Sequence, residues 1–129
     1  MRIGFVNGCF DILHIGHIHL FAYAKLHCDK LVVALDSDER VRANKGANRP
    51  FNTLLDRTLM VASIMYVDEV KWFSTDEELI YLVRDTSPDI MIVGEDYKDK
   101  RVIGSEHAKE LKFFRKIDGY STTKILESS

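Results

Sequence analysis

Short runs of apolar residues alternate along the chain with segments of helical periodicity. The runs at 2–6, 30–35, 69–73, 90–93 and 112–117 predict five strands. Between them, apolar residues return every three or four positions, which is the period of an amphipathic helix. The chain is therefore expected to alternate strand and helix along its whole length.

The periodic segments predict the helices. Helices are expected over 15–28 and 54–65, and from a capping-box Thr75 to about Asp85. A short helix is expected from Ser105 to Leu111, and a last helical turn from Ser121 to Leu126. The apolar residues that share one face of the second helix are Leu55, Leu59, Ala62 and Met65.

Two polar stretches, 36–53 and 94–104, are expected to be long loops, and long loops in compact domains are often functional. Strands that alternate with helices favour a parallel sheet with right-handed crossovers. The predicted fold class is thus α/β, a Rossmann-like five-stranded parallel sheet with helices on both faces. Ligands of such sheets bind at the carboxyl ends of the strands, where strand order reverses. The segments after the first and fourth strands are the candidates.

Composition narrows the range of functions. The 129 residues predict a single domain over 1–129. Eighteen Lys+Arg against 20 Asp+Glu disfavour a nucleic-acid surface but allow a local phosphate pocket. No apolar run approaches the ~18 residues of a membrane span. The first residues turn polar too early for a signal peptide, and the two cysteines form no disulfide framework, so a cytoplasmic location is expected.

Candidate chemistry is densest in the segment from Gly8 to His17, which follows the first predicted strand. His14 and His17 are three residues apart and so share one face of a helix. They lie at the predicted start of that helix, where free backbone N–H groups and the helix dipole favour anions. Gly16 lets a ligand approach the backbone closely. Two imidazoles in this place are suited to hydrogen-bonding a polyphosphate.

Three other interpretations of this cluster remain open from the residues alone. The histidines fit plain surface or capping residues. His14, His17 and His19 fit a metal-dependent hydrolase, although no nearby Cys, Asp or Glu completes a familiar zinc spacing. Cys9 fits a nucleophile with a histidine base, although no known signature surrounds it.

The segment from Gly8 to His17 resembles the H-x-G-H signature of the cytidylyltransferase-like nucleotidyltransferases, in its G-x-F-D-x-x-H-x-G-H form. Ser121-Thr122-Thr123-Lys124-Ile125 is similar to the segment that these enzymes use on the triphosphate. The resemblance extends from about residue 3 to residue 127.

Two relatives within this superfamily are similar to the chain. The segments at 45–50 and 94–98 resemble the adenylyltransferase domain of bacterial ADP-heptose synthase, with Glu95 where that domain usually has Gly. The segments at 66–70 and 121–125 resemble glycerol-3-phosphate cytidylyltransferase.

The resemblance implies a reaction. A nucleotidyl group passes from a nucleoside triphosphate, with ATP favoured, to a sugar or polyol phosphate such as heptose 1-phosphate, and pyrophosphate leaves. The first alternative is a CTP-dependent glycerol-3-phosphate cytidylyltransferase. An alternative of another class is a non-catalytic nucleotide-binding module. We expect a homodimer with no nucleic-acid or membrane partner.

The resemblance also implies the roles of individual residues. His14, His17 and Lys45 are the expected catalytic residues. Mg²⁺ is expected with the triphosphate, held by Asp11 together with Asp96. The residues expected to bind the nucleotide are Gly8, Cys9, Phe10, Gly16, Arg57, Gly94, Asp96, Tyr97, Ser121, Thr122 and Thr123.

Overall fold

Five parallel strands form one sheet in the computed structural model, which describes residues 1–115 and, at Asp96, the backbone alone. The strand order is β3-β2-β1-β4-β5, and every neighbouring pair is parallel. The α/β fold class predicted from the sequence is confirmed. The strands are β1 (Ile3–Gly8), β2 (Lys30–Asp36), β3 (Glu69–Phe73), β4 (Ile90–Gly94) and β5 (Glu110–Phe114).

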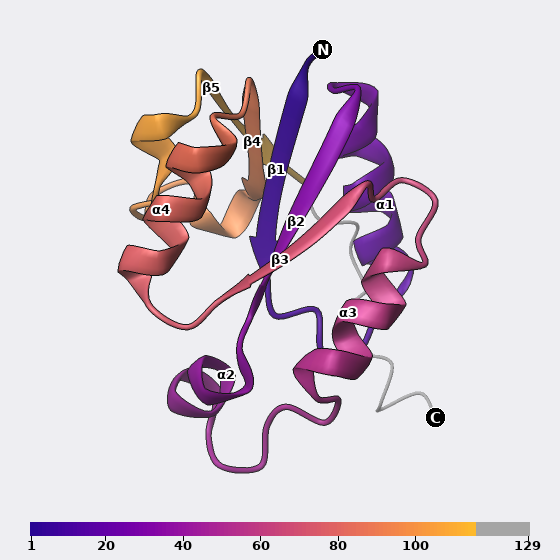
Figure 1. Ribbon diagram of the computed structural model, residues 1–129, viewed down its shortest axis with the longest axis vertical. Helices are drawn as coiled ribbons and strands as arrows, with labels where there is room; N and C mark the ends of the chain where they lie inside the picture. The colour runs from indigo at the N-terminus through magenta and orange to yellow at the C-terminus, as the bar shows by residue number, and fades with distance from the viewer. Residues whose placement is uncertain (116–129) are drawn as a thin grey trace.

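Helices lie on both faces of this sheet, as Figure 1 shows. α1 and α3 lie on one face and α4 lies on the other, whereas α2 lies beyond the carboxyl ends of the strands. The four helices are α1 (Ile15–Leu26), α2 (Asp38–Lys45), α3 (Leu54–Ala62) and α4 (Asp76–Thr86). Two short 3₁₀ helices follow β4, namely η1 (Glu95–Tyr97) and η2 (Ser105–His107).

The core consists of two apolar layers, one on each side of the sheet. Successive side chains of a strand point to opposite faces, so each central strand contributes to both layers. The strand residues of the layer under α1 and α3 include Val6, Val33, Leu35, Ile90 and Ile92. Those of the layer under α4 include Phe5, Val32, Ala34, Met91 and Val93. Burial on both faces explains why these strands are continuous apolar runs in the sequence.

Two aspartates tie the amino edge of the sheet together. Asp68 accepts from the backbone N–H of Leu31 at 2.7 Å and also pairs with Lys25. Asp89 accepts from the backbone N–H of Ile3 at 2.8 Å. These carboxylates hold the starts of β2 and β1 at the edge opposite to the one where ligands bind.

Strand order reverses between β1 and β4. β2 and β3 lie to one side of β1, and β5 lies beyond β4. The carboxyl ends of the two central strands, at Gly8 and Gly94, therefore border the crevice where ligands of open α/β sheets bind. The segments after the first and fourth strands were predicted for this role, and the topology confirms their position.

Two expectations about the polar stretches are wrong. The segment predicted as a loop over 36–53 contains α2, which begins after Ser37, whose Oγ accepts from the backbone N–H of Arg40 at 3.2 Å. Val41 is the buried residue of this helix, so its sequence has no apolar period to detect. The helix predicted from Ser105 to Leu111 is only the 3₁₀ turn η2, because β5 already begins at Glu110.

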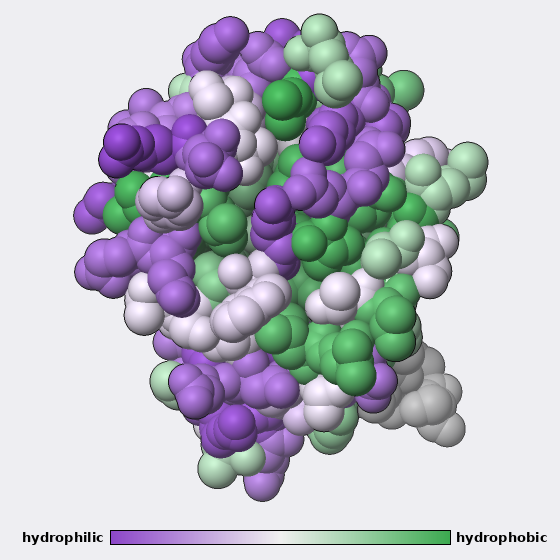
Figure 2. Space-filling model, in the orientation of Figure 1, coloured by the Kyte–Doolittle hydropathy of each residue, from purple (hydrophilic) through white to green (hydrophobic). Residues whose placement is uncertain are grey.

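The third correction concerns α3, which ends at Ala62 rather than at residue 65. The apolar face recognised in the sequence is turned to solvent, with Leu55 69% and Leu59 60% exposed. Figure 2 shows apolar side chains gathered on the surface over this helix. The residues that α3 buries are Arg57 and Val61. Within residues 1–115, none of the helices has both the length and the apolar character of a membrane span.

Candidate functional site

The two histidines of the first motif form the N-terminal cap of α1. His14 is the N-cap residue, and its Nδ1 accepts from the backbone N–H of Gly16 at 3.0 Å. His17 occupies the third helical position, and its Nδ1 accepts from the backbone N–H of His14 at 3.3 Å. This is a capping box in which imidazoles replace the usual Ser/Thr and Glu/Gln pair. The H-x-x-H spacing thus fixes both rings by backbone hydrogen bonds.

The cap also sets the tautomer of both rings. Because each Nδ1 accepts a hydrogen bond, the neutral ring carries its proton on Nε2. The rings stack with their centroids 3.9 Å apart, so the two histidines form one unit. The first turn of α1 contains no acidic residue, and the positive end of the helix dipole is not neutralised from within the helix. The arrangement favours an anion at this end of the helix.

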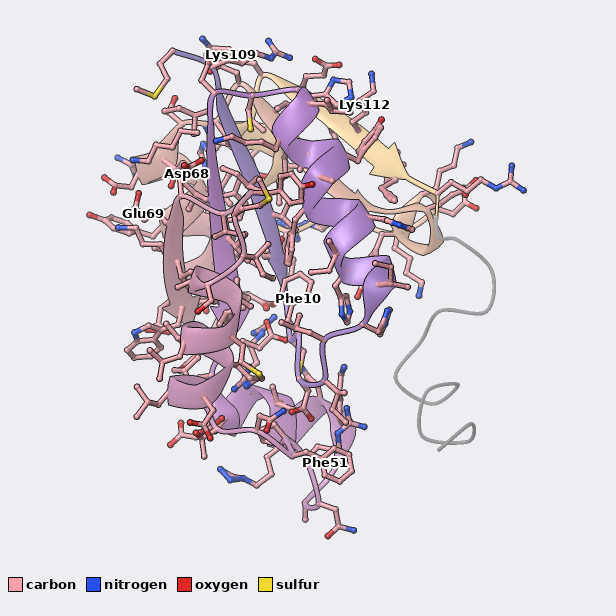
Figure 3. All side chains as sticks on the ribbon, turned by 90° about the vertical axis from the view of Figure 1, so that its right-hand side faces the viewer. Phe10, Phe51, Asp68, Glu69, Lys109 and Lys112 are labelled. Atoms are coloured by element: carbon pink, nitrogen blue, oxygen red, sulfur yellow. The ribbon has the colours of Figure 1, made fainter. Side chains whose placement is uncertain are left out.

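The Phe10 ring packs against His17 of this pair. Its backbone has a φ of 48°, a left-handed conformation that turns the ring into the core. The ring meets His17 edge-on at 5.2 Å and Phe21 at 5.1 Å between centroids. Figure 3 shows Phe10 between the carboxyl end of β1 and the start of α1. Phe10 was predicted to bind nucleotide, and the structure shows its ring packed against His17 and Phe21.

A small hollow of about 70 Å³ adjoins the histidine pair. His14, Gly16 and His17 line it on the side of α1, and Gly94 lines it on the side of β4. Its apolar wall consists of Leu20 and Phe114, which were not among the predicted site residues. An apolar wall beside an anion-binding helix end suits a ligand that combines a flat ring with phosphates.

A larger cleft of about 240 Å³ lies beside this hollow, and Gly94 lines both. Besides Gly94, four predicted residues line this cleft, namely Gly8, Cys9, Lys45 and Tyr97. The cleft is also lined by polar residues that were not predicted from the sequence, namely Asn7, Asp36, Arg40, Asn44 and Arg101. Arg40 and Asn44 lie on α2 together with the predicted Lys45, so they would have been found had that helix been predicted.

Charge in the larger cleft is mixed. Lys45, Arg40 and Arg101 supply positive charge that suits a phosphate. Burial raises the pKa of Asp36, although Arg40 and Lys45 act in the opposite direction. The side-chain oxygen of Asn7 is buried and has no hydrogen-bond partner among residues 1–115. Asp36 thus adds an acceptor to the lining of the cleft, and the Asn7 oxygen lies buried beside it.

Asp11 has a role different from the one predicted. Both of its carboxylate oxygens accept hydrogen bonds, at 2.8 Å from the backbone N–H groups of Phe51 and Asn52 and at 3.1 Å from Arg49 Nε. The side chain is 2% exposed, so these donors take the positions that a metal would need. The expectation that Asp11 holds Mg²⁺ is therefore corrected. Asp11 fastens the loop after β1 to the segment that precedes α3.

Arg57 is the second residue whose predicted role is wrong. It was expected to reach a phosphate, but its side chain is completely buried. Its guanidinium donates to the backbone oxygens of Cys9, Asp36 and Asn52 and to the Asp38 carboxylate. A group enclosed by four acceptors has no face for a triphosphate.

Three other interpretations of the first motif were open from the sequence. The capping geometry of His14 and His17 is present. The cysteine nucleophile and the metal-dependent hydrolase gain no support, because burial raises the pKa of the Cys9 thiol and the described residues contain no group of three His, Cys, Asp or Glu that could hold a metal ion. Ser121, Thr122 and Thr123 lie outside the described residues, and so does the side chain of Asp96.

The fold and this site together define a nucleotidyltransferase: a crevice at the switch point of a parallel sheet joins a histidine-capped helix end to a cationic cleft. Comparison with known proteins gives the particular family. The chain belongs to the cytidylyltransferase-like family, whose model matches residues 5–128. The match confirms the predicted resemblance and includes the Ser121-Thr122-Thr123 segment.

Similar proteins agree with this assignment. The chain is 48% identical over 122 residues to the bifunctional protein HldE of Campylobacter fetus, covering 95% of this chain and 26% of the relative. It is 44% identical over 127 residues to the bifunctional protein HldE of Helicobacter hepaticus, covering 98% and 26%. The chain thus spans about a quarter of the length of these curated relatives.

Solved structures share the fold. A lipopolysaccharide core biosynthesis protein from Thermoplasma volcanium superposes with a TM-score of 0.73 at 26% identity, over 92% of this chain and 99% of that one. A pantoate-beta-alanine ligase from Francisella tularensis superposes with a TM-score of 0.59 at 16% identity, over 99% of this chain and 65% of that one. The second likeness concerns the fold alone.

Proposed function

We propose that the chain transfers a nucleotidyl group from ATP to a phosphorylated sugar such as heptose 1-phosphate and releases pyrophosphate. The single observation that carries the proposal is the pair of hollows that meet at Gly94. One adjoins the histidine cap of α1, and the other combines cationic side chains with the Asp36 carboxylate, which can accept hydrogen bonds from a ligand's hydroxyl groups. The reaction needs such a pair of neighbouring sites for two phosphorylated substrates.

The proposed chemistry is alignment and charge neutralisation. The triphosphate lies against the N-terminus of α1, where the Nε2 protons of His14 and His17 are directed by the cap. The acceptor lies in the larger cleft, where Lys45 neutralises its phosphate. An acceptor phosphate oxygen attacks the α-phosphorus, and the bond to the departing pyrophosphate breaks. Mg²⁺ enters with the triphosphate as part of the substrate.

Nucleotide choice is the first test. We expect AMP transfer to predominate when equal ATP and CTP compete for one acceptor, because the central segments of the chain resemble the adenylyltransferase domain and the curated relatives are HldE proteins. Product analysis with heptose 1-phosphate and glycerol 3-phosphate as acceptors measures this directly. Predominant CMP transfer to glycerol 3-phosphate would favour the cytidylyltransferase instead. No pyrophosphate release with any acceptor would favour a binding module.

Lys45→Ala tests the role of the larger cleft. Lys45 is exposed at the end of α2, so its loss leaves no cavity and the melting temperature should stay unchanged. We expect kcat to fall roughly tenfold to a hundredfold, since one charge near the reacting phosphates is lost but solvent screens it in part. Arg42→Ala is the matched control, because Arg42 is an exposed cation in the same last turn and does not line the cleft. Equal kinetics in the two variants would remove Lys45 from the reaction.

Cys9→Ser tests for a covalent intermediate. Burial raises the pKa of the Cys9 thiol, which works against the thiolate that a nucleophile needs. We therefore expect Cys9→Ser to keep most of its activity, and a chiral α-phosphorothioate donor to react with inversion at phosphorus. Retention of configuration, or a labelled enzyme adduct that disappears in Cys9→Ser, would establish a two-step reaction.

A further inference from the structure

Arg57 lies at the meeting point of the segments that surround the larger cleft. The guanidinium is completely buried, and its four hydrogen-bond acceptors belong to different segments at the carboxyl ends of the strands. Its acceptors are the backbone oxygens of Cys9 at 3.0 Å, Asp36 at 2.7 Å and Asn52 at 3.0 Å, and Asp38 Oδ1 at 2.7 Å. One side chain of α3 thus holds the ends of β1 and β2, the start of α2 and the entrance to α3.

Two of these partners are themselves part of the cleft, since Cys9 and Asp36 both line it. The third link is to α2, because Asp38 is the first residue of that helix. α2 in turn contributes Arg40, Asn44 and Lys45 to the cleft. The contacts of Arg57 therefore extend to the walls of the cleft on the side of β1, β2 and α2.

Stability alone is a weak reason for such a group. The Arg57 guanidinium loses its hydration, whereas the Asp38 side chain stays 35% exposed, and an ion pair that desolvates a charge is often no more stabilising than apolar side chains of the same volume. What a guanidinium adds is direction, since its donors have a fixed planar geometry. Here the guanidinium fixes the orientation of α2, which lies apart from the two helical layers and buries Val41 (Figure 1).

The geometry of α2 makes this direction matter. Asp38 and Lys45 are the first and last residues of the helix, so they lie about 10 Å apart along its axis. A tilt of about 10° at Asp38 would move the other end by roughly 2 Å. Displacements of about 1 Å at a reacting group can reduce rates on the order of 10²-fold.

We infer that Arg57 is a positioning residue. Through its ion pair with Asp38, it fixes the orientation of α2 and so keeps Lys45 at the wall of the larger cleft. This inference rests on the proposed function where Lys45 serves the acceptor phosphate. Arg57 itself touches neither substrate, and the test is made through Asp38 because loss of a buried guanidinium is expected to unfold the chain.

The test compares Asp38→Ala with Glu39→Ala. Glu39 is exposed and is the next acidic residue in the same turn, so both variants lose one carboxylate near the helix N-terminus. In Asp38→Ala we expect kcat/KM for the acceptor to fall on the order of 10²-fold, while KM for ATP changes less than about threefold. Glu39→Ala should behave as the unaltered chain does. Asp38→Ala should melt at a lower temperature, because it leaves Nη2 of the buried Arg57 without its carboxylate acceptor, so the kinetics are compared well below both melting temperatures.

A double-variant cycle connects Asp38 with Lys45. If Asp38 acts through Lys45, the combined variant Asp38→Ala/Lys45→Ala should be no slower than Lys45→Ala alone. Multiplicative losses, or equal kinetics in Asp38→Ala and Glu39→Ala, would overturn the inference.

Hydrogen exchange supplies a readout without activity. Backbone amides of α2 should exchange at least tenfold faster in Asp38→Ala than in Glu39→Ala, and equal rates would overturn the positioning role even in an inactive protein. Absence of pyrophosphate release by the unaltered chain with every acceptor would instead contradict the proposed function, so the two failures are distinguishable.

Discussion

His17→Ala is expected to lower kcat for pyrophosphate release on the order of 10²–10³-fold, the usual cost of one lost electrostatic donor at a reacting phosphate. The reason is geometric. His17 presents an Nε2 proton from the first turn of α1 because its Nδ1 is occupied by the backbone N–H of His14. Steady-state kinetics with saturating nucleotide and acceptor measure the loss.

Two further variants separate catalysis from capping. His17→Gln keeps an acceptor for the His14 N–H, since Gln is a usual third residue of a capping box, but it has no imidazole. It should recover the melting temperature lost in His17→Ala without recovering kcat. His27→Ala changes the histidine at the other end of α1 and should leave kcat unaltered. Recovery of turnover in His17→Gln would show that His17 only caps the helix and takes no part in catalysis.

Asp11→Asn is expected to destabilise the fold on the order of 3 kcal/mol, which lowers the melting temperature by roughly 10 °C. The carboxylate is buried among the backbone N–H groups of Phe51 and Asn52 and the guanidinium of Arg49. An amide would turn one N–H₂ group toward these donors. Thermal unfolding at neutral pH measures the effect, and Asp56→Asn, on the exposed start of α3, is the control.

The same contacts give this contribution a pH dependence. Burial by itself raises the pKa of Asp11, but the hydrogen bonds from Asn52, Phe51 and Arg49 outweigh it and hold the pKa below its ordinary 3.8. The stabilisation is therefore complete above the carboxyl pKa of the unfolded chain and is lost as pH falls through the lower folded value. The difference between the unaltered chain and Asp11→Asn should shrink in acid. A raised Mg²⁺ requirement without loss of stability would restore the metal role.

Most of the fold could be predicted from the sequence because strands and amphipathic helices depend on local patterns of apolar residues. Buried parallel strands are continuous apolar runs, so β1, β2, β3 and β4 could be placed within a residue or two. α2 was not predicted, because this helix lies outside the two layers, buries only one apolar side chain, Val41, and so lacks a periodic pattern of apolar residues. The orientation of α3 was predicted wrongly although its sequence has a periodic pattern of apolar residues. Its apolar period was present, but the helix turns Arg57 inward toward backbone oxygens far away in the sequence.

The site divides along the same line. The position of His14, Gly16 and His17 at a helix start could be predicted because it depends on four consecutive residues. The roles of Asp11 and Arg57 could not, since the partners of Asp11 lie about forty residues away and those of Arg57 belong to three other segments. A charged residue in a motif is equally suited to a ligand or to a distant carbonyl, and only the folded chain distinguishes the two.

The central place of β1 in the sheet has a consequence for how the chain assembles during synthesis. One edge of β1 pairs with β2, where Ile3 aligns with Lys30, but its other edge pairs with β4, where Gly4 aligns with Ile90. β1, β2 and β3 are therefore complete while the second edge of β1 still lacks its neighbour. An unpaired apolar edge is a template for contact with other chains. Docking of β4, with the Asp89 carboxylate accepting from the backbone N–H of Ile3, closes that edge. Because this pairing joins segments far apart in the sequence, we expect it to form more slowly than the β1–β2 pairing.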